Sequence, residues 1–143
     1  MVQAFTSTPR EARWLRSRLR GLTPPLPVFN DTGRGSTRHI VFARQGGTDI
    51  ANLSGTMLVR SAWVVYVSEP VDEGETVYVE DLAADADRMH AAIYKPSEVN
   101  AVDGRYIEEC RRDFEHSLNV YDDEGNLVEV QLGGVYLIYT SLA

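Results

Sequence analysis

The residue types most often used for catalysis or metal binding are sparse in this chain. It contains one cysteine, Cys110, and three histidines, His39, His90 and His116. The histidines are spread along the sequence, and none stands at ligand spacing from a cysteine or from another histidine. Acidic residues are plentiful, but their abundance singles out no pair as a general acid and base. The sequence therefore predicts neither a metal site nor a bound cofactor.

Nucleophilic chemistry finds equally little support. The glycine-flanked serine of many hydrolases, Gly-X-Ser-X-Gly, does not occur. Cys110 and His116 could act as nucleophile and base, but a lone cysteine in an apolar strand is more often a small buried hydrophobe. The stretch from Gly33 to Ser36 lacks the lysine of a phosphate-binding loop and precedes a strand, so we interpret it as a flexible loop. We expect a protein that is not an enzyme.

Arginines are the charged residues whose placement carries most information. Residues 1–44 contain eight arginines and two acidic residues, a net charge of +6, whereas residues 45–143 contain six basic and nineteen acidic residues, a net charge of −13. A basic surface of one copy can meet an acidic surface of another head to tail. The alternative is that the two parts neutralise each other within one fold. The overall charge of −7 opposes tight binding to nucleic acid.

Arginine suits protein interfaces because its planar guanidinium donates paired hydrogen bonds. Glycine-rich segments, here Asp31 to Thr37 and Gly46-Gly47, are costly to fix without a partner, so we expect them to become ordered on assembly. The candidate interface residues are arginines of the first third of the chain and two glycines: Arg10, Arg13, Arg16, Arg20, Arg34, Arg38, Arg44, Gly46 and Gly47.

Length and composition predict a single domain that spans residues 1–143. The chain is 43% apolar and 24% charged, and its one cysteine cannot close a disulfide within the chain, so packing must supply the stability. The N-terminus lacks the basic start and apolar run of a secretory signal. The longest apolar run, Ala62 to Val67, is too short to span a membrane. We therefore expect a soluble protein without a membrane partner.

Two helices are predicted from the spacing of apolar residues. A polar cap and a proline mark the start of the first, which we expect from Pro9 to Leu22. The second is expected from Tyr78 to about Tyr94, with acidic residues near its start and the cation His90 near its end, as the helix dipole favours. The expected apolar faces are Ala12, Leu15, Leu19 and Leu22 in the first helix and Leu82, Ala86, Met89 and Ile93 in the second.

β-branched and aromatic residues predict the strands. The expected strands cover Val28 to Asn30, His39 to Ala43, Thr56 to Ser68, Tyr106 to Tyr121 and Leu127 to Thr140. The unbroken apolar middle of the third implies burial on both faces. Turns are expected at Gln45 to Ile50 and Asp122 to Asn126, and Gly133-Gly134 is interpreted as a bulge. This order predicts an α+β fold, with a mainly antiparallel sheet of about four or five strands, two helices packed on one face and a β-hairpin extension.

In this order the elements resemble the tail terminator proteins of long-tailed, siphovirus-type bacteriophages. The resemblance covers most of the chain. It rests on the helix from Pro9 to Leu22, the segment from Ile40 to Asp49, the strand and helix through Asp81 to Arg88, and the closing hairpin with Leu132 to Tyr136. The family is recognised by architecture, so no single residue here matches a family functional position.

The resemblance implies a structural virion protein, made in the host cytoplasm, whose copies form a ring, typically of six. The ring would cap the tail tube at its head-proximal end and stop polymerisation. Its partners would be the major tail tube protein and a head-tail connector or neck protein, with DNA passing through the lumen without specific binding. Two alternatives stay open: a head completion or neck connector protein of the same virion class, and a small cytoplasmic enzyme or ligand-binding domain with a pocket of convergent polar groups.

Overall fold

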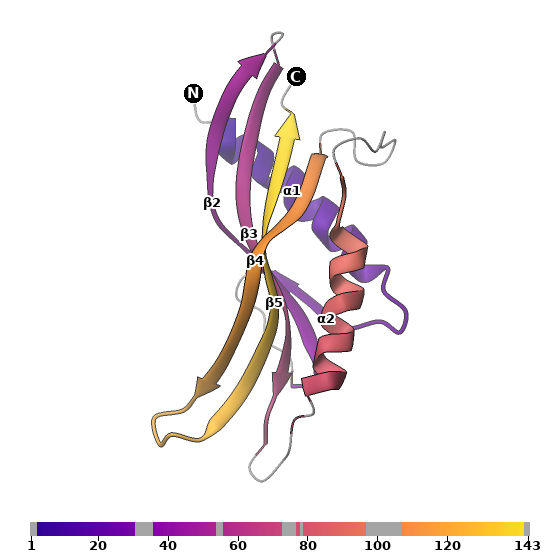
Figure 1. Ribbon diagram of the computed structural model, residues 1–143, viewed down its shortest axis with the longest axis vertical. Coiled ribbons are helices and arrows are strands. Elements are labelled where there is room, and N and C mark those ends of the chain that lie inside the picture. The colour runs from indigo at the N-terminus through magenta and orange to yellow at the C-terminus, as the bar shows by residue number, and fades with distance from the viewer. Residues whose placement is uncertain are drawn as a thin grey trace.

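The computed structural model describes residues 3–30, 36–53, 56–72, 77, 79–96 and 107–141. Two helices and five strands lie in this part of the chain (Figure 1). In chain order they are α1 (Gln3–Arg20), β1 (Val28–Asn30), β2 (His39–Leu53), β3 (Thr56–Pro70), α2 (Val79–Ile93), β4 (Ile107–Tyr121) and β5 (Leu127–Ser141).

The five strands form one sheet in the order β1-β2-β3-β5-β4. The short β1 runs parallel to β2, and all other neighbours are antiparallel. Both helices pack on the same face of the sheet, while β4 and β5 continue away from them as a long hairpin (Figure 1). The predicted α+β fold with a mainly antiparallel sheet is therefore confirmed.

Helix α1 begins at Gln3, so the prediction that Pro9 occupies its first position is wrong. Proline inside a helix removes the hydrogen bond that its missing N–H would donate, and its ring crowds the carbonyl four residues earlier, but the apolar face beyond Pro9 still packs on the sheet. Leu15 and Leu19 of the predicted face are fully buried, and Trp14 joins them in the core. The packing of this face offsets the local cost of the proline.

Strand β2 continues to Leu53, so the turn predicted at Gln45 to Ile50 is wrong. The glycines mark a register shift between Arg44 and Gly46, after which Gly46 pairs with Ala62 of β3. Glycine in a strand often accompanies such a bulge, and the long pairing with β3 carries the strand through it. Gly46-Gly47 is thus part of the sheet, paired with Ala62 and Ser61 of β3.

The bulge predicted at Gly133-Gly134 is also wrong. Both glycines pair in regular register with β3 on one side and with β4 on the other. The register shifts between β4 and β5 lie elsewhere along the two strands. A Cβ atom added to Gly133 would lie 2.1 Å from the carbonyl oxygen of Val65 and 2.5 Å from Cα of Tyr66. Glycine is needed there because the β3 backbone comes too close for any side chain.

The core lies between the helices and the sheet, and Trp63, Tyr136 and Phe42 are its largest fully buried side chains. The unbroken apolar middle of β3 is buried on both faces, as predicted: Val64 is 8% exposed and Val65 is 0% exposed. Three of the residues predicted for the apolar face of α2 are buried, namely Leu82, Met89 and Ile93.

Helix α2 is fixed to the sheet by a network of charges. Arg38, which directly precedes β2, donates to Glu69 Oε2 at 3.0 Å and to Asp85 Oδ2 at 2.7 Å. Arg88 Nη2 donates to Asp85 Oδ1 at 2.6 Å. Partial burial raises the pKa of Asp85, but the hydrogen bonds from Arg38 and Arg88 outweigh it, and the pKa lies below its ordinary value. Asp85 is therefore held in its charged form between two guanidinium groups.

Candidate functional site

One face of the sheet is covered by α1 and α2, and no helix of the described chain covers the other, which we call the open face (Figure 1). Side chains alternate between the two faces along a strand. Ser61 and Trp63 of β3 bond to α1, so Ala62 and Val64 between and beyond them belong to the open face. Paired residues of antiparallel strands share a face, so the register extends this assignment to β2, β5 and β4.

The middle of the open face is apolar. One row across four strands consists of Ala43, Val64, Val135 and Phe114. Val64 and Val135 are nearly buried, whereas Phe114 on the edge strand β4 is 59% exposed. Apolar residues therefore continue from the centre of the sheet to its β4 edge, where Phe114 is the exposed end of the row.

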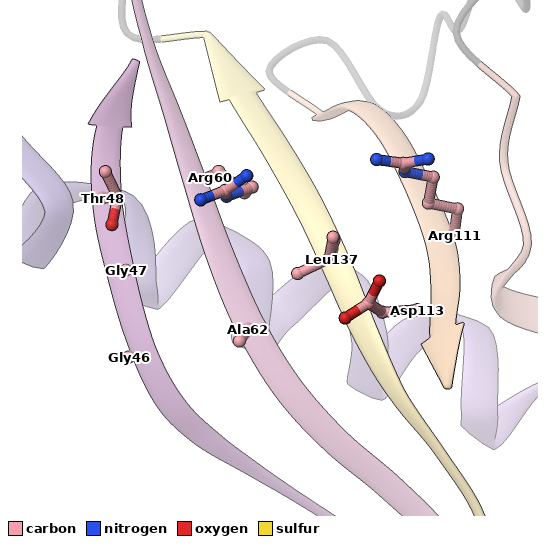
Figure 2. A pocket seen from close by; sticks show the side chains of 8 residues that line it. All are labelled: Gly46, Gly47, Thr48, Arg60, Ala62, Arg111, Asp113 and Leu137. Carbon is pink, nitrogen blue, oxygen red and sulfur yellow. The ribbon is translucent and has the colours of Figure 1, made fainter. Parts of the chain in front are cut away.

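Beside this row the open face contains a hollow of about 360 Å³ (Figure 2). Gly46, Ala62 and Leu137 stand side by side across β2, β3 and β5 and form its floor, and the small side chains at Gly46 and Ala62 leave the space open. A Cβ atom added to Gly46 would meet nothing within 4 Å. Gly47 has a different role, since its Cβ would lie 2.2 Å from Nη2 of Arg44, and the glycine leaves room for that guanidinium.

Two arginines flank the hollow. Figure 2 shows the guanidinium groups of Arg60 and Arg111 on either side of Leu137. Arg111 Nη2 donates to the hydroxyl of Tyr139 at 3.0 Å, and its Nε lies 3.2 Å from Glu109 Oε2. Guanidinium groups beside an apolar floor suit an acidic or aromatic side chain of a partner.

A chain of polar contacts ties three strands together on the other half of the open face. Glu129 Oε1 accepts hydrogen bonds from Ser68 Oγ at 2.6 Å and from Gln131 Nε2 at 2.9 Å. Gln131 Oε1 lies 2.8 Å from His116 Nε2, and the His116 ring stacks on Tyr66 with centroids 5.0 Å apart. These contacts attach the base of the β4–β5 hairpin to β3.

The hairpin itself exposes large apolar side chains. Phe114, Tyr121, Leu118 and Val128 are 59%, 57%, 48% and 37% exposed. No residue of β4 from Arg111 to Tyr121 is buried, so this part of the strand is accessible on both faces. Phe114 and Leu118 lie on the open face. Exposed apolar side chains that cluster on one element are typical of surfaces that contact another protein, a ligand or a membrane.

The turn that joins β4 to β5 lies at Asp122 to Asn126, as predicted, and it is acidic. The Asp122 carboxylate accepts backbone N–H bonds from Asn126 at 2.8 Å and from Glu124 at 2.9 Å. These bonds, above all the one from Asn126, lower the pKa of Asp122. Gly125 adopts a φ of 84°, where glycine is favoured. The side chains of Asp123 and Glu124 are exposed beside it.

Three of the predicted arginines gather on the outer surface of α1. Arg13, Arg16 and Arg20 line a second hollow of about 550 Å³ together with Ser17 and Gly21. Their spacings of three and four residues place them on one stripe of the helix. Within the part of the chain that the structure describes, none of the three makes a hydrogen bond or an ion pair. We call this surface the arginine hollow.

The other predicted arginines do not join the arginine hollow. Arg10 lies on α1 but is engaged in an interaction of its own. Arg38 is occupied by Glu69 and Asp85, and Arg44 faces the helix-covered side, where its Nη2 lies 3.4 Å from Ser61 Oγ. Arg34 lies outside the described residues.

The histidines occupy three separate places. His39 Nδ1 contacts the Thr37 carbonyl at 2.7 Å, and His90 Nδ1 lies 2.8 Å from the Tyr136 hydroxyl. His90 lies in the last turn of α2, as predicted, but burial, and then the charge of Arg112, lower its pKa and disfavour the predicted cation. Among the described residues, no three His, Cys, Asp or Glu side chains are grouped so as to hold a metal ion.

Cys110 is fully buried, which confirms its interpretation as a small hydrophobe. Burial raises the pKa of its thiol, so the thiolate that a nucleophile needs is disfavoured. His116 lies instead on the open face beside Tyr66 and Gln131.

Sequence reasoning missed the apolar hairpin as a surface. The available signal was the placement of Phe114 and Leu118 four residues apart in a strand that is otherwise polar, which puts both on one face. It also missed Glu11, whose charge on the apolar side of α1 gave no hint of a buried position. Only the folded chain brings its partners together.

Neither helix in the described ranges is long and apolar enough to cross a membrane. The role of these surfaces has to be inferred from the residues themselves, because neither protein-family models nor curated proteins match the chain.

Proposed function

We propose that this chain is a structural protein of a bacteriophage virion, a tail terminator whose copies form a closed ring at the head-proximal end of the tail tube. The ring ends tube polymerisation and joins the tail to a connector or neck protein. Two features support the proposal, namely the resemblance of the element order to tail terminators and the apolar hairpin. The hairpin is the observation that carries it.

Water contact with the hairpin is unfavourable. Full burial of a large apolar side chain stabilises by roughly 1.5 to 3 kcal/mol, so covering Phe114 and Leu118 provides a driving force for association. Phe114 is the exposed end of the apolar row, whose inner members Val64 and Val135 are already buried in a single copy. β4 is an edge strand, and beyond its bridge to Lys95 no other described strand pairs with its outer side. A neighbouring copy can therefore approach the hairpin from that side.

A ring follows if the hairpin contacts a different surface of the next copy. Contacts between unlike surfaces are heterologous, and they close into a ring when the rotation between copies closes. The net charge of −7 suits a ring with a channel through which DNA passes without binding.

The first test is the assembly state of the purified chain. Native mass spectrometry and negative-stain microscopy are expected to find rings with one defined number of subunits. The double variant Phe114→Ser/Leu118→Ser is expected to remain monomeric with an unchanged circular dichroism spectrum, because both side chains are exposed in the folded monomer. Val79→Ser is the matched control, since Val79 is also 59% exposed but lies on α2, and it should leave the rings intact. A wild-type chain that stays monomeric at every concentration would overturn the proposal.

The second test separates the tail terminator from its alternatives. Rings added to polymerising tail tube protein of the same phage are expected to bind tube ends and to stop elongation, as seen in micrographs. Rings that bind the head connector but ignore tube ends would identify a neck or head completion protein instead. Turnover of a small molecule by a strict monomer would identify an enzyme.

A further inference from the structure

We infer that the acidic turn at the tip of the β4–β5 hairpin of one copy docks into the arginine hollow on α1 of the next copy. The inference rests on the proposed ring assembly and names the two surfaces that meet in it. The contacting groups are the carboxylates of Asp123 and Glu124 on one copy and the guanidinium groups of the arginine hollow on the other.

The arginine hollow carries a charge that its own chain leaves uncompensated. Arg13, Arg16 and Arg20 repeat at helix spacings, so like charges stand as neighbours along one stripe of about 10 Å. The described part of the chain offers them no acidic partner, unlike Arg38, which is held by Glu69 and Asp85. An acidic group from outside relieves the repulsion and receives paired N–H donors.

The hairpin tip is prepared to supply that group. The Asp122 carboxylate accepts hydrogen bonds from the backbone amides of Glu124 and Asn126, and these bonds fix the turn in the single copy. The neighbouring carboxylates of Asp123 and Glu124 are exposed and make no hydrogen bond or ion pair with other described residues. Because the backbone is already fixed, docking loses little conformational entropy there.

Within one copy the two surfaces cannot meet. Figure 1 places the hairpin turn at the far end of β4 and β5, whereas α1 crosses the helix-covered face beyond the other half of the sheet. The contact must therefore join two copies through unlike surfaces. This is the kind of contact from which a closed ring is built.

Nucleic acid phosphates are the competing occupant of the arginine hollow. The hairpin of a second copy is favoured because the net charge of the chain, −7, repels DNA. The acidic residues of the chain include those of this turn, which can therefore supply the partner group. Docking the tip also carries Phe114 and Leu118 toward the neighbouring copy, where they can be covered.

Charge reversal tests the pairing directly. The tip variant Asp123→Lys/Glu124→Lys and the hollow variant Arg13→Glu/Arg16→Glu/Arg20→Glu are each expected to lose the ring in native mass spectra at low salt. Mixed in equal amounts, the two variants should form rings again, with copies alternating, because each reversed surface then meets its complement. The matched control Glu80→Lys reverses an exposed charge in the first turn of α2, an element that belongs to neither surface, and should assemble like the wild type.

The outcomes separate this inference from the proposed function. Wild-type rings that survive both reversals would overturn the pairing and leave the ring intact as a conclusion. Loss of the ring in both variants without recovery in the mixture would also overturn it. A hollow variant that keeps its rings but loses salt-sensitive binding to duplex DNA would assign the hollow to phosphates. A wild-type chain that never assembles would overturn the pairing and the proposed function together.

Discussion

Glu11 illustrates how a charged residue type is accommodated in the core of this fold. The side chain is fully buried, and its carboxyl group accepts hydrogen bonds from Thr140 Oγ1 at 2.6 Å, Trp63 Nε1 at 2.7 Å and Ser61 Oγ at 3.1 Å. These donors come from β3 and β5, so one residue of α1 connects the helix to two strands. A buried polar group of this kind is tolerated only while its partners are all present.

Replacement of Glu11 should therefore destabilise the chain strongly. Glu11→Ala leaves three donors buried without an acceptor, and we expect it to lower the free energy of unfolding by about 3 kcal/mol. Glu11→Gln keeps the size and one acceptor oxygen, so its loss should be smaller. Urea denaturation followed by circular dichroism measures both. An alanine variant with the wild-type midpoint would contradict this account of the helix attachment.

His90 predicts a pH dependence of stability. Its pKa in the folded chain lies below the ordinary value of 6.5, so the unfolded chain binds a proton more readily. The stability that neutral His90 contributes is present above that ordinary value and is lost as the pH falls through the folded pKa.

Unfolding free energies measured between about pH 7 and about pH 5 should therefore fall more steeply for the wild type than for His90→Gln, which cannot titrate. The upper end of the pH range serves as the control, because His90 is neutral there in both the folded and the unfolded chain. The stability of the wild type and of the variant should then change equally with pH. Equal slopes throughout would mean that His90 does not contribute.

At the scale of elements, the close approach of β3 and β5 is the most demanding contact. Gly133→Ala would place Cβ against the backbone of Val65 and Tyr66, which cannot move aside as a flexible side chain can. We expect a loss of about 3 kcal/mol in unfolding free energy, because overpacked strands must separate. Gly46→Ala is the matched control: it also lies in a strand but meets open space, so its stability should change little or rise slightly. Thermal denaturation of the two variants checks the contrast, and equal effects would contradict it.

Elements that depend on residues close together in the sequence could be predicted from it. The spacing of Leu15 and Leu19 fixed the buried face of α1, and the unbroken apolar middle of β3 predicted its burial on both faces. The turn predicted in β2 failed because the local preference of Gly46-Gly47 is overruled by pairing with β3, which is a tertiary effect.

The candidate site followed the same division. The stripe of Arg13, Arg16 and Arg20 could be predicted because helix spacing places the three together. The sequence could not predict that Arg38 lies apart from these arginines, because its partners Glu69 and Asp85 are 31 and 47 residues away in the sequence. Contacts at such separations depend on the whole fold and leave no periodic pattern.

For the whole molecule, association and folding should be linked. If rings bury the hairpin, assembly stabilises the folded chain by mass action, and each tenfold rise in protein concentration adds up to about 1.4 kcal/mol. The thermal midpoint of the wild type should then rise by about 4 °C per tenfold increase. Phe114→Ser/Leu118→Ser should show no such rise. Differential scanning calorimetry over a hundredfold concentration range provides the comparison, and a constant wild-type midpoint would argue against assembly.

The short strand β1 has a protective consequence. Ile40, Val41 and Phe42 form a buried, uncharged and strongly β-prone run at the outer edge of β2, the kind of segment that stacks into amyloid-like fibrils when its backbone is open. β1 pairs with these three residues, and the carbonyl of Pro27 accepts a hydrogen bond from the Ile40 amide at 2.8 Å. The three residues of β1 therefore cover the part of the β2 edge where this β-prone run would otherwise offer its backbone to another strand.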